Sequence, residues 1–435
     1  MKLISIPAFR RLCSGLSLLL LTACAATNSP TDNQDTDNPG GQNAATGVLI
    51  FGDGGYHLMY PDQEDFVELF STEEYLQSEW DSWLEDRRPA EEFEAAPSAI
   101  SPVTGKTVMA SGMNGVSQAM KNFCRDTAQC DFGVMLGDNI YPSGATLGAD
   151  GKDDAQRFYD NLTAPFGKLA STNPDYTVYV TLGNHDWETS RAGGFAQIEF
   201  LEQSEDFYMD GPFYSVKPPA GKGEIELFVI DTSMMLASTT VYEDFLDENA
   251  AEVVTDVIAV PNYHVEPLTE AEKDMASWLE TALQNSTAKW KIVLAHHPIW
   301  SSSGSKFEQG RALRELILPA MCRYADALLV GHDHTLEVHT DDCSAALGQA
   351  TAEPLTQIVS GAAAKQRPVN TNFIRQQDLK YPSHKTVFAK GLLWGFAHMQ
   401  IEGDEARVQL LSIPDDGSSA ITVEYEFQFR RRSGP

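Results

Sequence analysis

The sequence predicts an α/β protein in which short buried strands alternate with helices. The apolar runs typical of buried strands lie at 48–52, 132–136, 177–182, 291–295 and 327–330. Runs that are apolar throughout, rather than alternating, favour a largely parallel sheet that is covered on both faces. From residue 395 onward apolar and polar residues alternate, and this pattern predicts antiparallel strands at the carboxyl end of the chain.

The remaining elements follow from helical periodicity and from end signals. Helices are expected at 72–86, 115–123, 154–166, 269–284 and 311–322, and further strands at 227–230 and 357–360. Ser-Thr-Glu-Glu at 71–74 matches a capping box, in which side chains at both positions satisfy the first backbone N–H groups of a helix. The alternation of helices and strands therefore continues along most of the chain.

A targeting signal occupies the amino terminus. A basic start, with Lys2, Arg10 and Arg11, precedes a short apolar run at 16–21. The run leads into Leu-Thr-Ala-Cys at 21–24, which resembles the signal of bacterial lipoproteins. The run is short for a segment that crosses a bilayer, which favours a cleaved signal.

The lipoprotein resemblance implies that residues 1–23 are removed as a signal peptide and that Cys24 carries lipid. The protein would then be anchored in a bacterial cell envelope, at the outer membrane or cell surface. An ordinary signal peptide cleaved near Ala26 and a membrane anchor left in place are the alternatives. Residues 24–46 are rich in Asn, Asp, Thr, Pro and Gly and are expected to form a flexible tether. The folded domain is expected to span 47–435.

Charge and cysteine content narrow the classes of partner. The chain of 435 residues has a formal net charge of −31, whereas nucleic-acid binding needs a basic surface, so no nucleic-acid partner is expected. Four cysteines follow Cys24, an even number that in an exported chain predicts disulfides. Three pairings are open, and Cys124–Cys130 with Cys322–Cys343 closes the shortest loops.

Five of the predicted strands end in residue types that bind metals. The motifs are Gly-Asp-Gly-Gly at 52–55, Gly-Asp-Asn-Ile-Tyr at 137–141, Gly-Asn-His-Asp at 183–186, Ala-His-His-Pro at 295–298 and Gly-His-Asp-His at 331–334. Because ligands gather beyond the carboxyl ends of strands in open α/β sheets, we expect these side chains at one edge. Carboxylates, a phenol, an amide and imidazoles together fit a hydrolytic site with two metal ions.

The order of these motifs resembles the calcineurin-like metallophosphoesterase superfamily. Two details narrow the resemblance: no histidine stands two residues after Asp53, and Asp138 is followed by Tyr141. Both are similar to the purple acid phosphatases, particularly the small tartrate-resistant type, over about residues 47–412. The resemblance implies a four-layer αββα sandwich of two mixed β-sheets flanked by helices, with residues 47–435 as its catalytic domain.

The same resemblance implies a binuclear metal centre of Fe(III) and a divalent ion, which is Fe, Zn or Mn. Carried over to this sequence, Asp53, Tyr141 and His334 would hold the ferric ion, Asn184, His296 and His332 the divalent ion, and Asp138 would bridge both. Donor chemistry agrees, because phenolate and carboxylate suit a hard trivalent ion whereas imidazole and amide oxygen suit the divalent ions.

The implied activity is that of an acid phosphatase, which hydrolyses small phosphate monoesters outside the cytoplasm with a metal-bound hydroxide as the nucleophile. His185 is expected to steady the phosphate or protonate the leaving group, and Asp186 to orient His185. His297 is a second catalytic candidate, and the alternative for it is packing beside the ligand loop. The loop at 301–308 lacks the His-Glu pair of the small family members, so no acid is assigned there.

Other functions fit the same motifs. A phosphodiesterase or nucleotidase of the same superfamily is the first alternative, because the leaving group binds in variable loops. A surface lipoprotein that binds a partner without catalysis is the second, although every ligand position is filled. The sequence does not indicate an oligomeric state.

Two acidic segments, 61–94 and 240–266, are insertions relative to the common family pattern. The first carries 13 acidic residues against Arg87 and Arg88, and it follows Asp53 at the catalytic edge. One hypothesis is an acidic lid that disfavours highly charged substrates. The alternative is a helix that only packs Trp80 and Trp83 against the core.

Overall fold

The computed structural model describes residues 45–60, 71–169, 173–258 and 265–432. These described residues belong to one compact unit. The predicted signal peptide and nearly all of the predicted tether lie outside the described residues, so both remain predictions. Among the residues that are described, no helix combines the length and the apolar character needed to cross a bilayer.

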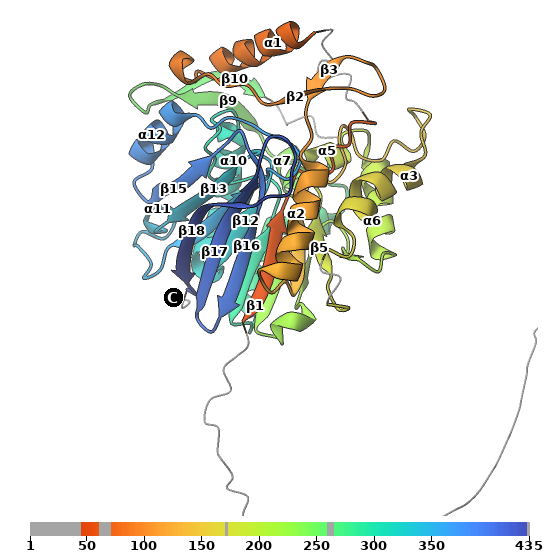
Figure 1. The fold of residues 1–435 in the computed structure, drawn as a ribbon. Helices are drawn as coiled ribbons and strands as arrows, with labels where there is room; N and C mark the ends of the chain where they lie inside the picture. Colours follow the sequence, from red (N-terminus) through yellow and green to blue (C-terminus); the bar gives the residue numbers. More distant parts are fainter. Residues whose placement is uncertain (1–44, 61–70, 170–172, 259–264, 433–435) are drawn as a thin grey trace, which may run out of the picture. The chain divides into compact units, whose positions relative to one another are not determined.

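Two seven-stranded mixed sheets form the centre of the unit (Figure 1). In the first sheet the spatial order is β18 (Thr422–Arg430), β17 (Glu405–Ile413), β16 (Trp394–Glu402), β1 (Thr46–Phe51), β4 (Phe132–Leu136), β5 (Val178–Thr181) and β6 (Phe207–Tyr208). The strands from β1 to β6 are parallel to one another, and β16, β17 and β18 add an antiparallel half.

The second sheet has the same mixed character. In spatial order its strands are β15 (His384–Lys390), β13 (Leu336–Asp341), β14 (Leu355–Ser360), β12 (Ala327–Val330), β11 (Trp290–Leu294), β8 (Ile225–Val229) and β7 (Tyr214–Val216). The four central strands from β14 to β8 are parallel, and β7, β13 and β15 pair antiparallel. The sheets meet face to face: the Ser360 hydroxyl donates to the Ile50 carbonyl at 2.8 Å, and that of Thr181 to the Ile230 carbonyl at 3.3 Å.

Helices flank the two sheets, except for α1, which lies at one end of the unit (Figure 1). The longer ones are α1 (Thr72–Glu85), α2 (Met113–Asp126), α6 (Arg191–Glu202), α9 (Met275–Asn285), α10 (Phe307–Tyr324) and α12 (Thr371–Lys380). Short helices are α3 (Asp154–Phe158), α4 (Ala164–Phe166), α5 (Asn184–Trp187), α7 (Thr232–Ala237), α8 (Glu270–Lys273) and α11 (Ser344–Leu347). Helix α2 packs on β16 and β17 of the first sheet, and α9 packs on β8 of the second. The predicted αββα sandwich is therefore confirmed.

Several elements were not anticipated from the sequence, and each has a local reason. Helix α7 is short, helix α12 and strands β13 and β15 are rich in polar residues, and helix α6 contains two adjacent glycines, which disfavour a helix, so the sequence signal of each is weak. The acidic insertion at 240–266 contains a hairpin of β9 (Val241–Leu246) and β10 (Glu252–Ile258). Acidic and apolar residues do not alternate with a period of two there, because β9 reads VYEDFL and β10 reads EVVTDVI, so the strand pattern was not apparent.

Both disulfides follow the sequence-local pairing. Cys124 and Cys130 join the end of α2 to the approach to β4, and Cys322 and Cys343 join α10 to the end of β13. The second disulfide therefore brackets the motif at 331–334. The predicted pairing that closes the shortest loops is therefore confirmed.

The first acidic insertion forms a capped helix, as predicted. The Ser71 hydroxyl accepts from the Glu74 N–H, and the Glu74 carboxylate accepts from the Ser71 N–H, which completes the capping box of α1. Trp80 and Trp83 pack edge-on against Phe93, 4.9 and 5.5 Å between ring centroids. The two indoles thus pack within their own insertion. Figure 1 shows α1 at one end of the unit, beside the hairpins β2–β3 (Ser98–Ile100 and Thr107–Met109) and β9–β10.

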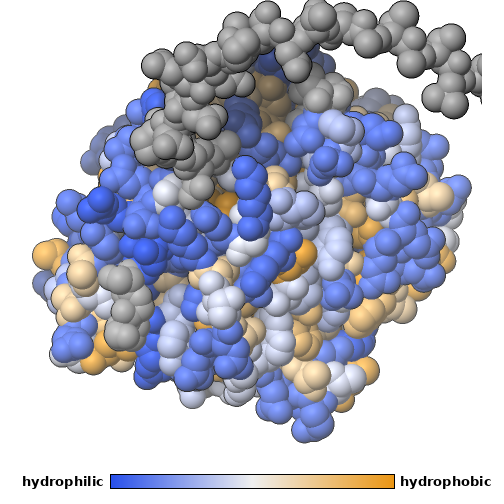
Figure 2. Space-filling view, turned by 90° about the horizontal axis from the view of Figure 1, so that it is seen from below, coloured by the Kyte–Doolittle hydropathy of each residue, from blue (hydrophilic) through white to orange (hydrophobic). Residues whose placement is uncertain are grey.

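The side of the unit opposite α1 is largely polar (Figure 2). Figure 2 shows it mainly covered by hydrophilic residues, with hydrophobic residues interspersed among them. Scattered apolar residues of this kind are usual on folded proteins.

Candidate metal centre

The strand-end residues meet at one edge, where the carboxyl ends of the parallel strands of both sheets lie. Asp53 follows β1, Asp138 follows β4, Asn184 begins α5 after β5, His296 follows β11, and His332 and His334 follow β12. All five of these strands are internal to their sheets. The fold thus brings together all seven predicted ligands, with Tyr141 contributed by the loop after Asp138.

Tyr141 is the centre of an oxygen-rich group. Its hydroxyl lies 3.0 Å from Asp53 Oδ1, 2.9 Å from Asp138 Oδ2 and 3.1 Å from His334 Nε2. The Asp53 Oδ1 and His334 Nε2 atoms are themselves 3.3 Å apart. These four residues are buried, so their donor atoms face one another and not solvent.

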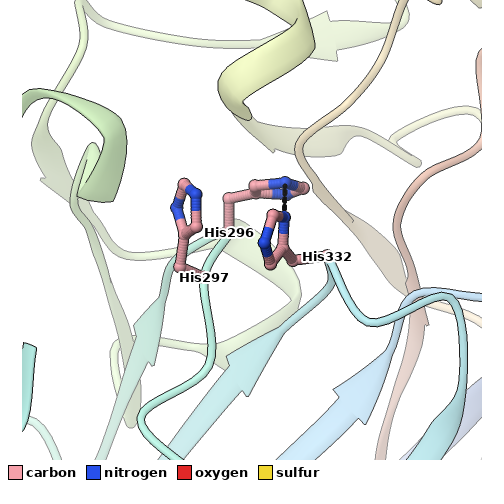
Figure 3. Close-up of side chains that lie close together, drawn as sticks. All are labelled: His296, His297 and His332. Carbon is pink, nitrogen blue, oxygen red and sulfur yellow. Dashed lines mark hydrogen bonds between the residues drawn. The ribbon is translucent and has the colours of Figure 1, made fainter. Parts of the chain in front are cut away.

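A second group forms around His296. Its Nε2 lies 3.2 Å from Asn184 Oδ1, 3.2 Å from Asp138 Oδ2 and 3.0 Å from His332 Nδ1. Figure 3 shows His296 and His332 turned toward each other, with His297 standing beside them. Asp138 is common to both groups, which is the position expected of a bridging ligand.

The donor set fits a bound cation. The other ring nitrogen of His296, Nδ1, lies 2.8 Å from the Leu136 carbonyl, which can only accept, so Nδ1 carries the hydrogen. In the neutral ring Nε2 then presents a lone pair to the Asn184 oxygen and the Asp138 carboxylate, which are acceptors. A cation among these groups would satisfy them. A proton on Nε2 has the same effect: burial lowers the pKa of His296, but the charge and hydrogen bond of Asp138, the Asp53 charge and the Leu136 carbonyl together outweigh it and raise this pKa to about 9.

The backbone is shaped to bring these side chains inward. Asp53, Asp138, His332 and His334 all have left-handed conformations, with φ of 57°, 50°, 70° and 55°. Such conformations cost about 1 to 3 kcal/mol each at residues other than glycine and are concentrated at functional sites. A side chain at Gly331 would clash with Asp53 Oδ2, so the glycine allows the backbone to pass close to the carboxylate.

His185 lies at the edge of the oxygen-rich group. Its ring centroid is 4.5 Å from that of Tyr141, and its Nδ1 is 2.5 Å from the Pro142 carbonyl. His185 is half-buried, like the proposed ligand Asn184, whereas Tyr141 and Asp138 are fully buried. This placement leaves His185 beside the centre and accessible to a substrate.

Asp186 is hydrogen-bonded to two of the ligand loops. Its carboxylate accepts hydrogen bonds from the N–H groups of Asn139, Ile140 and Gly183 and from the Gln197 amide. Burial, followed by the charge of Asp138, raises the pKa of Asp186 to about 7. These hydrogen bonds show that Asp186 joins the two ligand loops, and the Pro142 carbonyl contacts the His185 ring. The orientation of His185 by Asp186 remains a prediction.

His297 faces the imidazole side of the centre. Its Nδ1 lies 2.8 Å from the Thr232 hydroxyl, and its ring centroid is 4.3 Å from that of His332. A ligand atom of each of His296, His297 and His332 lies within 4.8 Å of the others. His297 is thus packed beside the ligand loop and is also close enough to act on a group bound there.

Three residues near the centre were not anticipated. Gln309 Oε1 lies 3.1 Å from His332 Nε2, and Arg367 donates to the His332 carbonyl at 3.1 Å. The Lys365 ammonium lies 4.4 Å from the centroid of the Tyr141 ring. Lys365 and Arg367 follow the strand that ends at Ser360, and their basic side chains after a predicted strand were the signal that could have identified them.

The chain belongs to the calcineurin-like phosphoesterase family, whose sequence model matches residues 109–336. Purple acid phosphatase 3 of Arabidopsis thaliana is 29% identical over 217 residues, which cover 48% of this chain and 49% of that protein. Purple acid phosphatase 4 of the same plant is 28% identical over 253 residues, covering 58% and 63%. The chain thus spans about half to three-fifths of the length of these curated relatives.

The fold also has a counterpart among solved structures. GAP50, described as the anchor in the inner membrane complex of Plasmodium, aligns with a TM-score of 0.52 at 14% identity, covering 90% of each chain. At this identity the similarity concerns the fold alone. The family match and the seven converging donors make the chain a metallophosphoesterase with distant similarity to purple acid phosphatases.

Proposed function

We propose that the protein is a binuclear-metal acid phosphatase that hydrolyses small phosphate monoesters outside the cytoplasm. The observation that carries the proposal is the convergence of the seven donors into two groups that share Asp138. The similarity to plant purple acid phosphatases supports it, as does the Tyr141 phenol within the oxygen-rich group. A phenol in this position distinguishes the centre from one made of carboxylates and imidazoles only.

The two groups of donors would hold different ions. Asp53, Tyr141 and His334 would hold Fe(III), Asn184, His296 and His332 would hold Fe(II), Zn or Mn(II), and Asp138 would contact both. When bound, such a pair of ions clamps a phosphate ester and lowers the pKa of coordinated water, which supplies a nucleophile.

The other residues prepare and orient the reaction. His185, held through Nδ1 by the Pro142 carbonyl, would direct Nε2 toward the leaving oxygen and donate a proton to it. Asp186 keeps the loops after β4 and β5 together through its hydrogen bonds and acts as a positioning residue. His297, held by Thr232, would contact the phosphate from the imidazole side.

The test compares p-nitrophenyl phosphate with its bis(p-nitrophenyl) ester on the purified protein, together with metal analysis. We expect the monoester to be hydrolysed with the higher kcat/KM and to find two metal ions per chain, one of them iron. Faster hydrolysis of the bis ester would replace the proposal by a phosphodiesterase. Absence of hydrolysis with both metals bound would favour a surface protein that binds a partner without catalysis.

We also propose that Cys24 carries the lipid that anchors the protein in the cell envelope. The Leu-Thr-Ala-Cys sequence at 21–24 after a basic and apolar start supports this proposal. Cys24→Ser should release the protein from the membrane fraction or prevent its processing. A mature amino terminus beyond residue 24, or an unmodified Cys24 in mass spectrometry, would contradict it.

A further inference from the structure

A cavity of about 260 Å³ lies beside the proposed metal centre, under helix α1. Its walls include Trp83 and Arg88 from the first insertion, Met109 from β3, and His334 and Arg367 from the loops after β12 and β14. Because His334 is both a proposed ligand and part of the wall, the cavity adjoins the place where a substrate phosphate would bind. Its volume is just below the range of pockets for drug-sized ligands, so it suits a smaller group.

Arg88 supplies a buried positive charge to this cavity. Its side chain is only 3% exposed, and it forms an ion pair with Asp86 at 2.5 Å and a 3.5 Å hydrogen bond to the Ser303 carbonyl. Within the described part of the chain its Nε has no hydrogen-bond acceptor. A buried donor without an acceptor is destabilising, so a bound group that accepts from Nε would complete the hydrogen bonding of Arg88.

Arg367 adds a second guanidinium group to the same cavity. Its hydrogen bond to the His332 carbonyl fixes it at the edge of the metal centre. Burial lowers the pKa of Arg88 and the Arg367 charge lowers it further, although Asp86 acts in the opposite direction. Two like charges at one cavity repel each other, and an anion between them would relieve that repulsion.

The acidic groups that face the cavity do not cancel the attraction of Arg88 and Arg367 for an anion. They are Asp86, which is already paired with Arg88, and Glu79, whose carboxylate accepts from the Ala96 N–H at 3.4 Å. Burial raises the pKa of Glu79, which weakens its negative charge relative to an exposed glutamate. The acidic residues at 73, 74, 81 and 85 are exposed on the outer side of α1.

We propose that the Arg88–Arg367 cavity binds a second anionic group, carried by the leaving group of the phosphate ester. The preferred substrates are then compact monoesters with a further phosphate or carboxylate a few bonds from the reacting phosphorus. The inference rests on the proposed phosphatase function and names its substrate class. It also revises the hypothesis of an acidic lid, because the outer side of α1 would repel large polyanions while the inner side selects a small leaving group that carries one anionic group.

The experiment measures kcat/KM for ethyl phosphate, phosphoglycolate and ethylene glycol bisphosphate in the metal-loaded protein. The first has no second anionic group, the second adds a carboxylate and the third adds a phosphate. We expect the wild type to prefer each of the latter two over ethyl phosphate by about tenfold or more, which is the effect of one charged hydrogen bond. The larger of the two ratios identifies the favoured anion.

Variants then assign the preference to the cavity. Arg88→Met and Arg367→Met should each reduce the ratio about tenfold, and Arg88→Lys should restore part of it. The ratio is the readout because a general loss of activity cancels in it. Arg87→Met is the matched control, because Arg87 is adjacent in sequence but exposed, with its guanidinium 3.6 Å from the centroid of the Phe245 ring.

The outcomes separate the inference from the proposed function. Hydrolysis of ethyl phosphate with no preference for the second anion would overturn the inference and leave the phosphatase assignment intact. An equal loss of preference in Arg87→Met would also overturn it, because the effect would then be one of overall charge. Failure to hydrolyse any of the three esters with both metals bound would contradict the proposed function itself, and the inference with it.

Discussion

The two sheets contribute different chemistry to the same edge of the molecule. We call Asp53, Asp138, Tyr141 and Asn184 the oxygen edge, because the first sheet delivers them, and His296, His332 and His334 the imidazole edge, delivered by the second. The edges are not separate sites. Tyr141 of the oxygen edge contacts His334 at 3.1 Å, and His296 contacts Asn184 at 3.2 Å.

Each proposed ion is therefore held from both sheets. This arrangement means that metal binding and the docking of the two sheets stabilise each other, because a bound ion adds its binding free energy to the folded state. It also provides two positions for the two proposed ions. Mixing hard oxygen donors with imidazoles in unequal proportions makes the two positions chemically distinct.

The largest effect is expected where the two edges meet. Asp138→Ala should remove both ions and activity together, because its carboxylate contacts Tyr141 at 2.9 Å and His296 at 3.2 Å. The loss in metal affinity should exceed the roughly 10- to 100-fold typical of residues that only support a ligand. Metal content and turnover are measured together, with the exposed Asp175→Ala as the control. A variant that keeps both ions would break the account of Asp138 as the bridge.

The disulfides test whether the two edges are braced unequally. Cys322–Cys343 closes a loop of 21 residues around the imidazole edge, and Cys124–Cys130 closes one of 6 residues before the oxygen edge. By loop-closure entropy their replacement by alanine pairs should lower the free energy of unfolding by about 3 and about 2 kcal/mol respectively. Urea unfolding measures both variants. A larger loss at Cys124–Cys130 would reverse the comparison.

The second sheet also buries His384, which lies away from the metal centre. Its burial predicts that the free energy of unfolding of the protein falls in acid. Burial, partly opposed by Asp378, lowers the pKa of His384 to about 4. In the unfolded chain the imidazole titrates near 6.5, so its contribution to stability is present above that pH and is lost as the pH falls toward 4. The lost stability is on the order of 3 kcal/mol. His384→Gln should flatten the unfolding free energy between these pH values, and an unchanged slope would refute this role.

His185 tests the division between holding metal and moving a proton. It contacts the Pro142 carbonyl and stands beside Tyr141, outside the two groups of donors. His185→Ala should keep both ions and lower turnover by about 10²-fold, the usual contribution of a general acid. The effect should be smaller for p-nitrophenyl phosphate, whose leaving group needs little protonation, than for an alkyl phosphate. Loss of metal in this variant would place His185 in the ligand set instead.

The elements and ligands that the sequence predicts correctly are those with a local motif. Contacts between distant segments are not predicted. The strands at 132–136 and 327–330 and the capping box of α1 have the predicted bounds because apolar runs and capping residues are read within a few positions. The convergence of the seven donors could also be predicted from the sequence, because the carboxyl ends of parallel strands lie at one edge of an α/β sheet.

The contacts that the sequence did not predict involve side chains whose partners are far away in the chain. The role of Asp186 depends on N–H groups 46 and 47 residues earlier, which its neighbour His185 does not reveal. Arg88 and Arg367 meet only because α1 folds over the loop after β14. The acidic residues counted in the first insertion include those exposed on the outer side of α1. Their number does not reveal that Arg88 is buried on its inner side.

The visible spectrum of the purified protein with and without Tyr141 tests most directly whether the oxygen edge holds a ferric ion. A phenolate bound to Fe(III) absorbs visible light, as implied by the similarity to the purple acid phosphatases. We expect a violet to pink oxidised protein, with one iron per chain, and loss of the colour in Tyr141→Phe while His332 and His296 still retain the divalent ion. A colourless and fully active wild type that contains only zinc or manganese would contradict the account and leave a metallophosphoesterase without a ferric site.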